Sequence, residues 1–276
     1  MTSRNRRHRR VLIEPMAHRA CTLVGALGLA GTLAGPALAD VLVGTAGGDT
    51  LVGTAGPDQL YGEDGDDLLR DLGGNDYLEA GPRDDRVEGG HGVDLLIGGT
   101  GDDRLGGGPG DDVVYAGAGN DTLLGGPGDD TLFGQAGDDR LFGGPGRDRI
   151  YASLGSNFVD GGPGADRIVA AGCEATILGG PGNDVIDALG GGMVVRGGRG
   201  NDRIRTGAGA DRVSGGRGAD RIATGAGDDQ IDIRDGRRDR LDCGPGWDVV
   251  RADRVDVLER CEVVRLRGAP RVVSPP

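Results

Sequence analysis

The chain contains 276 residues, of which 59 are Gly and only 3% are aromatic, and its formal net charge is −13. Gly at roughly three times its usual share of ~7% indicates a repetitive architecture in place of a conventional globular domain. The absence of a Gly-X-Y triplet repeat and the presence of only 13 Pro exclude collagen. The chain contains Arg but no Lys, and no basic stripe follows residue 20. This distribution argues against a nucleic-acid-binding protein.

Residues 1–39 have the organisation of a secretory signal peptide. A run rich in Arg precedes an apolar stretch at residues 21–33, which is too short to span a bilayer, and a small-x-small cleavage site ends at Ala39 before Asp40. We predict cleavage near Ala39-Asp40 and a secreted, extracellular mature chain without a membrane span. A retained membrane anchor is the alternative. Cleavage removes six Arg and one Glu, which leaves 25 basic and 43 acidic groups and a formal charge of −18.

A nine-residue repeat runs from Gly44 to Asp232 without an insertion and makes 21 units. When each unit is numbered 1 to 9, position 8 is aliphatic in all 21, position 4 is Gly in 19 and position 6 is Asp in 18. A disordered Gly/Asp tract is the alternative, but disorder does not require an aliphatic residue at every ninth position. The pattern therefore predicts a folded unit repeated along the chain.

The consensus GGxGxDxUx, as in the segments GGPGDDTLF and GGRGNDRIR, resembles the calcium-binding nonapeptide of the RTX, or hemolysin-type, family over residues 44–251. The resemblance implies an all-β fold, a right-handed parallel β-roll (β-solenoid) of about 21 nonapeptide units with two units per coil. In that family the first six residues of a unit form a turn, the last three form a strand, and calcium lies between turns of successive coils. We accordingly assign residues 40–232 to the calcium-binding β-roll and residues 233–276 to a degenerate repeat, a small C-terminal cap and a tail.

The resemblance implies that the position-6 carboxylates bind Ca²⁺, which takes six to eight oxygen ligands. One Asp and backbone carbonyls supply half of such a shell, and the turn two units later supplies the other half. The unbroken row, on one edge of the roll, contains Asp58, Asp76, Asp94, Asp112, Asp130, Asp148, Asp166, Asp184, Asp202 and Asp220. The interrupted row, on the other edge, contains Asp49, Asp67, Asp85, Asp103, Asp121, Asp139, Asp211 and Asp229. Nine pairs in the first row and six in the second predict about 15 Ca²⁺ ions.

The interrupted row has Asn157, Ala175 and Met193 at position 6 in three consecutive coils. We predict a metal-poor gap there, with softer structure around residues 155–195 on that edge. The unbroken row and the first block of the interrupted row are then expected to load with calcium first. The alternative is that Asn157 still binds metal and that the roll tolerates two missing ions.

Calcium binding and folding are expected to be coupled. Position 8 points inward in a short strand, so each unit buries one aliphatic side chain, which contributes roughly 2 kcal/mol. Ordering a unit costs on the order of 1 kcal/mol or more for each of its nine residues. The stacked carboxylates also repel one another, so the metal-free roll is expected to be unstable.

Two sets of outward-facing residues invite alternative interpretations. Tyr115, Phe133 and Tyr151 share position 9 in successive coils. They predict either a stabilising aromatic ladder or an apolar surface for a partner. Arg recurs at position 7 and is interpreted as charge balance beside the acidic turns, with a polyanion-binding site as the alternative.

The repeat pattern breaks after Asp232, and the remaining residues are predicted to cap the open end of the roll. Trp247 and the aliphatic residues that follow it supply apolar side chains for such a cap. In a secreted chain Cys243 and Cys261 are predicted to form a disulfide. Cys173 then remains, either as a buried inert thiol or as a site of intermolecular pairing.

Catalytic motifs are missing from the sequence: His91 is the one His of the predicted mature chain, and neither HExxH nor GxSxG occurs. We predict a non-enzymatic, secreted calcium-ion-binding repeat protein that folds on binding Ca²⁺, with a structural or adhesive role and a cell-surface or matrix component as its partner. The alternative is an accessory calcium-binding module of a secreted enzyme or toxin system encoded elsewhere. No nucleic acid is expected as a partner. An ice-binding roll is disfavoured because the turns offer no regular rows of outward Thr.

Overall fold

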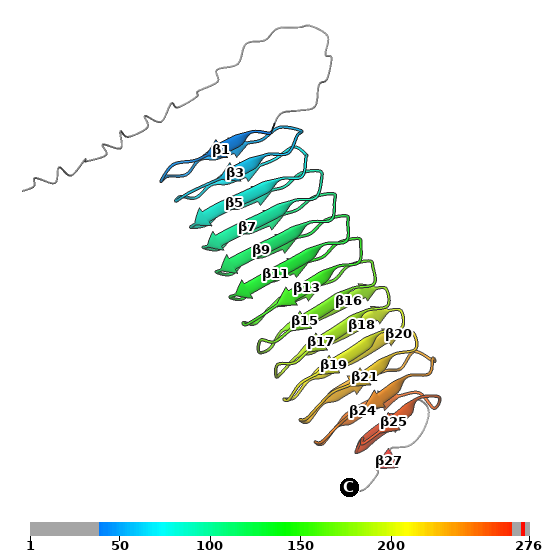
Figure 1. The fold of residues 1–276 in the computed structure, drawn as a ribbon. Helices are drawn as coiled ribbons and strands as arrows, with labels where there is room; N and C mark the ends of the chain where they lie inside the picture. The colour runs from blue at the N-terminus through cyan, green and yellow to red at the C-terminus, as the bar shows by residue number, and fades with distance from the viewer. Residues whose placement is uncertain (1–38, 267–271, 274–276) are drawn as a thin grey trace, which may run out of the picture. The chain divides into compact units, whose positions relative to one another are not determined.

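The computed structural model describes residues 39–266 and 272–273. All regular structure in this part of the chain is β, and consecutive strands alternate between two parallel sheets (Figure 1). In the same residues no helix is long and apolar enough to cross a membrane. The predicted signal peptide falls, apart from its last residue, outside the described residues.

The two sheets consist, over the described residues, of 13 and 14 strands. The first sheet contains β1 (Val41–Val43), β3 (Gln59–Tyr61), β5 (Tyr77–Pro82), β7 (Leu95–Thr100), β9 (Val113–Ala118), β11 (Thr131–Ala136), β13 (Arg149–Ala152), β15 (Arg167–Ala170), β17 (Val185–Ala188), β19 (Arg203–Thr206), β21 (Arg221–Ala223), β23 (Arg240–Asp242) and β25 (Val257–Glu259). The second sheet contains β2 (Thr50–Val52), β4 (Leu68–Arg70), β6 (Arg86–Glu88), β8 (Arg104–Gly106), β10 (Thr122–Leu124), β12 (Arg140–Phe142), β14 (Phe158–Asp160), β16 (Thr176–Pro181), β18 (Val194–Arg199), β20 (Arg212–Arg217), β22 (Gln230–Asp232), β24 (Val249–Ala252), β26 (Val263–Leu266) and β27 (Val272–Val273).

Strand pairing follows the nine-residue repeat directly. Leu123 in β10 aligns with Leu105 on one side and Leu141 on the other, so neighbouring strands of a sheet are two repeat units apart. Each coil therefore contains two nonapeptides, one strand for each sheet, and the prediction of an all-β parallel solenoid is confirmed. Figure 1 shows the coils following one another in sequence order from β1 to β25.

The core lies between the two sheets and is built mainly from position 8. The position-8 side chains from Leu60 to Ile231 are at most 4% exposed, because strand geometry turns this position inward while positions 7 and 9 face outward. Each contributes roughly 2 kcal/mol of hydrophobic stabilisation. The turns of the interrupted row add buried Ala side chains at position 1, for example Ala116 and Ala152.

The turns can stack closely because Gly occupies the crowded positions. Gly128 has a φ of 152°, and a Cβ at this residue would overlap the carbonyl group of Gly110 in the preceding coil. Any other residue would both strain the backbone and force the coils apart. The close stacking brings backbone and side-chain oxygens of successive turns together.

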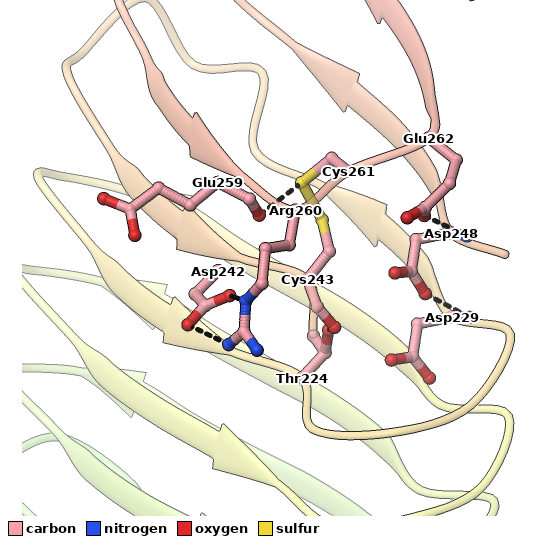
Figure 2. Close-up of a disulfide and its surroundings, with 9 residues drawn as sticks. All are labelled: Thr224, Asp229, Asp242, Cys243, Asp248, Glu259, Arg260, Cys261 and Glu262. Atoms are coloured by element: carbon pink, nitrogen blue, oxygen red, sulfur yellow. Dashed lines mark hydrogen bonds and ion pairs between the residues drawn. A yellow bond between two sulfur atoms is a disulfide. The ribbon is translucent and has the colours of Figure 1, made fainter. Parts of the chain in front are cut away.

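The C-terminal coils keep parallel pairing while the repeat length changes. Ile222 aligns with Leu241, one residue beyond the regular two-unit step, whereas the step from Val249 to its partner Val263 is shorter than two units. Parallel pairing thus continues past residue 232, the end of the regular repeat, and β27 adds an antiparallel strand to β26. The predicted disulfide between Cys243 and Cys261 is present and links the last coils (Figure 2).

The position-9 aromatic residues form a stacked ladder on the outer face of the first sheet. The ring centroids are 4.6 Å apart for Tyr115 and Phe133 and 4.9 Å apart for Phe133 and Tyr151, and the rings are within 7° of parallel. The rings cover each other's faces, so this stack supports the ladder interpretation. Cys173, whose burial the sequence left open, is an exposed free cysteine.

Candidate metal-binding turns

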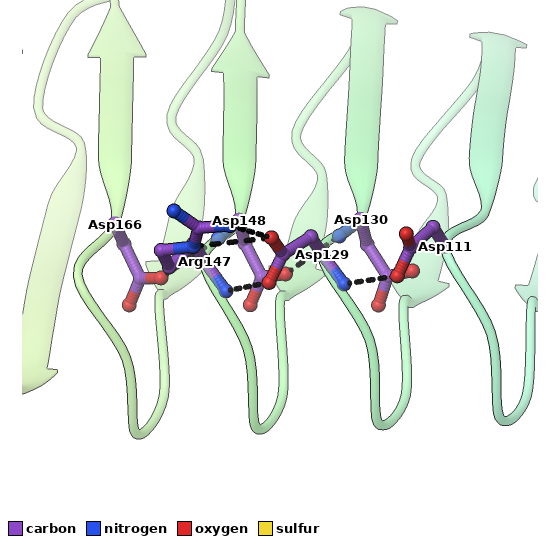
Figure 3. A network of polar contacts seen from close by, with 6 residues as sticks. All are labelled: Asp111, Asp129, Asp130, Arg147, Asp148 and Asp166. Atoms are coloured by element: carbon purple, nitrogen blue, oxygen red, sulfur yellow. Dashed lines mark hydrogen bonds and ion pairs between the residues drawn. The ribbon is translucent and has the colours of Figure 1, made fainter.

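The position-6 carboxylates tie each turn to the preceding coil. The backbone N–H of Asp112 donates to Oδ1 of Asp130 at 2.8 Å, and the N–H of Asp130 donates to Oδ1 of Asp148 at 2.9 Å. The same bond recurs along both rows, and these side chains, apart from that of Asp49, are almost completely buried. Figure 3 shows Asp130, Asp148 and Asp166 stacked in this way. One oxygen of each carboxylate therefore has a structural role.

The second carboxylate oxygen, Oδ2, is buried and has no hydrogen-bond partner in the described residues at 16 of the 18 predicted ligands. These are Asp67, Asp76, Asp85, Asp94, Asp103, Asp112, Asp121, Asp130, Asp139, Asp148, Asp166, Asp184, Asp202, Asp211, Asp220 and Asp229. A buried polar atom without a partner costs about 1–3 kcal/mol, and more if it is charged. A cation beside each Oδ2 would offset this cost along both edges, so the geometry fits the predicted ligand rows.

The free Oδ2 atoms converge with backbone carbonyls of the next coil. A Cβ added to Gly161 would lie 2.6 Å from Oδ2 of Asp166 and 2.6 Å from the carbonyl oxygen of Gly179. We refer to such a space, bounded by a position-1 residue, the Asp of its own unit and the position-1 residue two units further on, as an inter-coil site. These oxygens would hold a hard cation such as Ca²⁺, whose oxygen ligands lie at about 2.3–2.6 Å.

The atoms that face the inter-coil sites are carboxylate and backbone carbonyl oxygens, which suit a hard cation and disfavour soft metals. No group of three or more His, Cys, Asp and Glu side chains that could hold a metal occurs within the described ranges. An ion in an inter-coil site therefore draws part of its shell from backbone carbonyls. The residues present fit calcium, and they fit it through the stacking of turns.

Burial and mutual repulsion raise the pKa values of these carboxylates and so disfavour their ionised form. Burial is the main cause that raises the pKa of Asp112 and Asp130 to about 7, and the charge of the carboxylate in the preceding coil raises it further. The pKa of Asp148 is also raised to about 7 for the same reasons. A divalent cation bound by these carboxylates would offset the repulsion and favour their ionised form.

The interrupted row loses its carboxylates in the middle of the roll. Oδ1 of Asn157 still accepts the N–H of Asp139 at 2.8 Å, but Ala175 and Met193 are fully buried members of the hydrophobic core. The methyl end of Met193 would lie 2.5 Å from a Cβ on Gly190, so an apolar side chain fills this turn. This arrangement is consistent with the predicted metal-poor gap, which remains a prediction.

In the first turn of each row, the Oδ2 atom of the position-6 Asp has hydrogen-bond partners. Oδ2 of Asp49 accepts hydrogen bonds from the N–H and hydroxyl of Thr45, at 2.6 and 2.8 Å, and Oδ2 of Asp58 accepts the same pair from Thr54. Burial raises the pKa of Asp58, but hydrogen bonds from Asp40 and Thr54 outweigh it and the pKa is lowered. Thr45 and Thr54 therefore give these two Oδ2 atoms hydrogen bonds that the Oδ2 atoms further along the rows do not have.

Two Asp residues that were not among the predicted ligands have the same geometry. The N–H of Asp220 donates to Oδ1 of Asp239 at 2.8 Å, and the N–H of Asp229 donates to Oδ1 of Asp248 at 3.0 Å. Their Oδ2 atoms are also buried without a partner among the described residues. The ligand prediction ended at Asp229 because one extra residue precedes Asp239 and interrupts the nine-residue step. The segment GPGWD before β24 was the available signal, and Figure 2 shows the row ending where Glu262 accepts the N–H of Asp248.

Position 5 adds a second, exposed row of bonds that runs in the opposite direction. The N–H of Asp129 donates to Oδ1 of Asp111, and the N–H of Arg147 donates to Oδ1 of Asp129, both at 2.8 Å (Figure 3). The Arg147 guanidinium also pairs with Oδ2 of Asp129 at 2.6 Å. Successive turns are thus joined through both position 5 and position 6, although the sequence indicated a role for position 6 only.

Comparison with known proteins agrees with this geometry. A family model described as RTX calcium-binding nonapeptide repeat (4 copies) matches residues 43–70, 72–105, 106–141, 133–168, 176–192 and 196–231. No curated protein matches the chain. Among solved structures, a hyperactive, Ca²⁺-dependent, beta-helical antifreeze protein from an Antarctic bacterium is similar with a TM-score of 0.56 and 18% sequence identity, over 87% of this chain and 95% of that one. At this identity the likeness concerns the fold alone.

Proposed function

The chain belongs to the RTX calcium-binding nonapeptide repeat family, and from that premise we propose that it is a secreted protein that folds as it binds calcium between stacked turns. The observation that carries the proposal is the repeated buried Oδ2 without a partner in the described residues. Calcium supplies the positive charge and the oxygen coordination that these atoms need. Binding energy then becomes folding energy, because the inter-coil sites exist only when the coils are stacked.

The proposed ligands are the position-6 Asp residues of the two rows, with about 15 ions held between successive coils. In each inter-coil site Oδ2 contributes the side-chain oxygen, while Oδ1 stays bonded to the backbone of the preceding coil. Asp239 and Asp248 extend the two rows by one turn each, which adds one pair to each row and brings the proposed number to about 17 ions. Asn157 is the one gap residue with an oxygen to offer, and Ala175 and Met193 contribute none.

The proposed role is structural or adhesive and not catalytic. Family repeats span residues 43–231 with short gaps, and His91 is exposed at a turn. Extracellular location is supported by the disulfide between Cys243 and Cys261, since such bonds persist in oxidising compartments. A cell-surface or matrix component is the proposed partner class. An accessory module of a separately encoded secreted enzyme or toxin system is the second candidate, supported by the same repeats.

Antifreeze activity, named for the structural neighbour, is not carried over to this chain. Outward position 7 of the first sheet holds Arg149, Arg167 and Arg203. The aromatic ladder occupies part of position 9 on the same face. Neither is a regular row of small hydroxyl side chains.

The proposal is tested by adding calcium to the chelated mature chain and following circular dichroism. We expect a gain of β signal with Ca²⁺, reversed by chelator, and little gain with Mg²⁺ at equal ionic strength, because Mg²⁺ demands octahedral geometry and gives up its water reluctantly. An unchanged spectrum across the calcium titration, or the full β signal in excess chelator, would refute it.

A further inference from the structure

Asp71 departs from the repeat at a place where charge is otherwise missing. It stands at position 1 of its unit and is the only charged residue at that position in the 21 units. Its side chain is 3% exposed, and its Oδ2 has no hydrogen-bond partner among residues 39–266. A buried carboxylate in this condition requires a counter-charge or a proton.

The carboxylate of Asp71 points into the inter-coil site of the preceding coil. A Cβ on Gly53 would overlap Oδ2 of Asp71 and would lie 3.0 Å from Oδ2 of Asp58. In the corresponding site at Gly161, the atom from the next coil is the backbone carbonyl oxygen of Gly179. The side chain of Asp71 therefore takes the place that a neutral carbonyl has elsewhere in the same row.

Local hydrogen bonds orient this carboxylate. Oδ1 of Asp71 accepts the N–H of Leu72 at 2.6 Å and the N–H of Gly73 at 3.0 Å, which leaves Oδ2 directed at the inter-coil site. Burial is the main cause that raises the pKa of Asp71 to about 6, and the carboxylates of Asp76 and Asp58 raise it further. No Arg forms an ion pair with Asp71 in the described part of the chain.

We propose that the inter-coil site between Asp58 and Asp76 is a calcium site of a distinct kind, in which Asp71 replaces a backbone carbonyl as a ligand, and that it is the tightest site of the roll. The inference rests on the proposed function. Calcium affinity rises with the number of charged ligands, and this site has one carboxylate more than the others of its row. The unpartnered Oδ2 of Asp71 is added to Oδ2 of Asp58, which also accepts the N–H and hydroxyl of Thr54. It lies near the N-terminal end of the solenoid, so the first ion orders the first coils.

The test uses Asp71→Gly, which restores the residue that the repeat prefers and so should not disturb folding in saturating calcium. Ala80→Gly is the matched control, because it makes the same restoration one turn later in the interrupted row. Asp71→Asn keeps the size and removes the charge. Calcium binding to the mature chain is measured by competition with a chelating dye of known affinity, and circular dichroism reports folding.

We expect the unsubstituted chain and Ala80→Gly to show one ion bound about tenfold or more tighter than the rest. Asp71→Gly and Asp71→Asn should lose this tight class and still fold at high calcium. A tight class that survives both substitutions would overturn the inference, and so would its absence from the unsubstituted chain. If neither the unsubstituted chain nor any variant binds calcium or gains β structure, the proposed function itself fails. If all of them fold and bind calcium with the same affinity, Asp71 only shares a proton with its neighbours, and this inference alone fails.

Discussion

Asp130→Asn separates the structural oxygen of a position-6 carboxylate from its proposed metal-binding oxygen. Oδ1 of Asp130 accepts the N–H of Asp112, and an Asn side chain retains that bond, as Asn157 does with Asp139 at 2.8 Å. The substitution replaces the buried, unpartnered Oδ2 by an NH₂ group and removes one charge. We therefore expect the coil to remain stacked while its calcium site is lost.

The cost of the substitution follows from the calcium concentration. Extracellular calcium modules have Kd values of about 10⁻⁴–10⁻³ M. Losing one such ion at about 10 mM calcium lowers the free energy of unfolding by about 1.4–2.7 kcal/mol, from RT ln(1 + [Ca²⁺]/Kd). At about 1 mM calcium the same expression predicts a loss of about 0.4–1.4 kcal/mol. The penalty should thus grow with calcium.

Urea unfolding at the two calcium concentrations measures this penalty. Asp129→Asn is the control, since it removes the same charge from the neighbouring exposed position, where Oδ1 accepts the N–H of Arg147 and Oδ2 pairs with its guanidinium. We expect little calcium dependence in the control. A penalty for Asp130→Asn that is equal at both concentrations, or equal to that of Asp129→Asn, would show that Oδ2 does not bind the ion.

Three further predictions concern pH, the ladder and the disulfide. Burial raises the pKa of Asp103 and Asp112 in the folded roll to about 7 from 3.8, so the metal-free fold binds protons more tightly than the unfolded chain. The contribution of these protonated carboxylates to the stability of the metal-free fold is fully present below about pH 4 and is lost as the pH rises through about 7. β signal in chelator that increases with pH contradicts this. Phe133→Ser removes two ring stacks and should lower the free energy of unfolding, measured in saturating calcium, by about 1–3 kcal/mol. Loss of binding to a partner without loss of stability would favour the surface interpretation. Replacing Cys243 and Cys261 by Ser removes a disulfide between residues 18 positions apart and should lower the free energy of unfolding by about 3 kcal/mol. Hydrogen exchange should become faster only in β23–β26. Uniform loss of protection would contradict a local cap.

The architecture is largely decided by local pattern, which is why it can be predicted from the sequence. An aliphatic residue at every ninth position, as in Leu105, Val114 and Leu123, leaves one inward side chain per short strand. Gly in the turns permits close stacking, and Asp before each strand repeats at the same place. These features recur without an insertion up to Asp232, so each coil predicts the next and the two-unit spacing of the strands follows.

The details of the sites depend on atoms one coil away, and only the stacked structure decides them. Equivalent Asp residues have free Oδ2 atoms in the middle of a row, but Thr54 satisfies Asp58 at its N-terminal end. The geometry of Asp239 depends on pairing that absorbs an extra residue. The direction of the Asp71 carboxylate depends on Gly53, which lies at the same position two units earlier. Period and composition determine which residues recur, whereas contacts between coils determine which carboxylate oxygens are left for an ion.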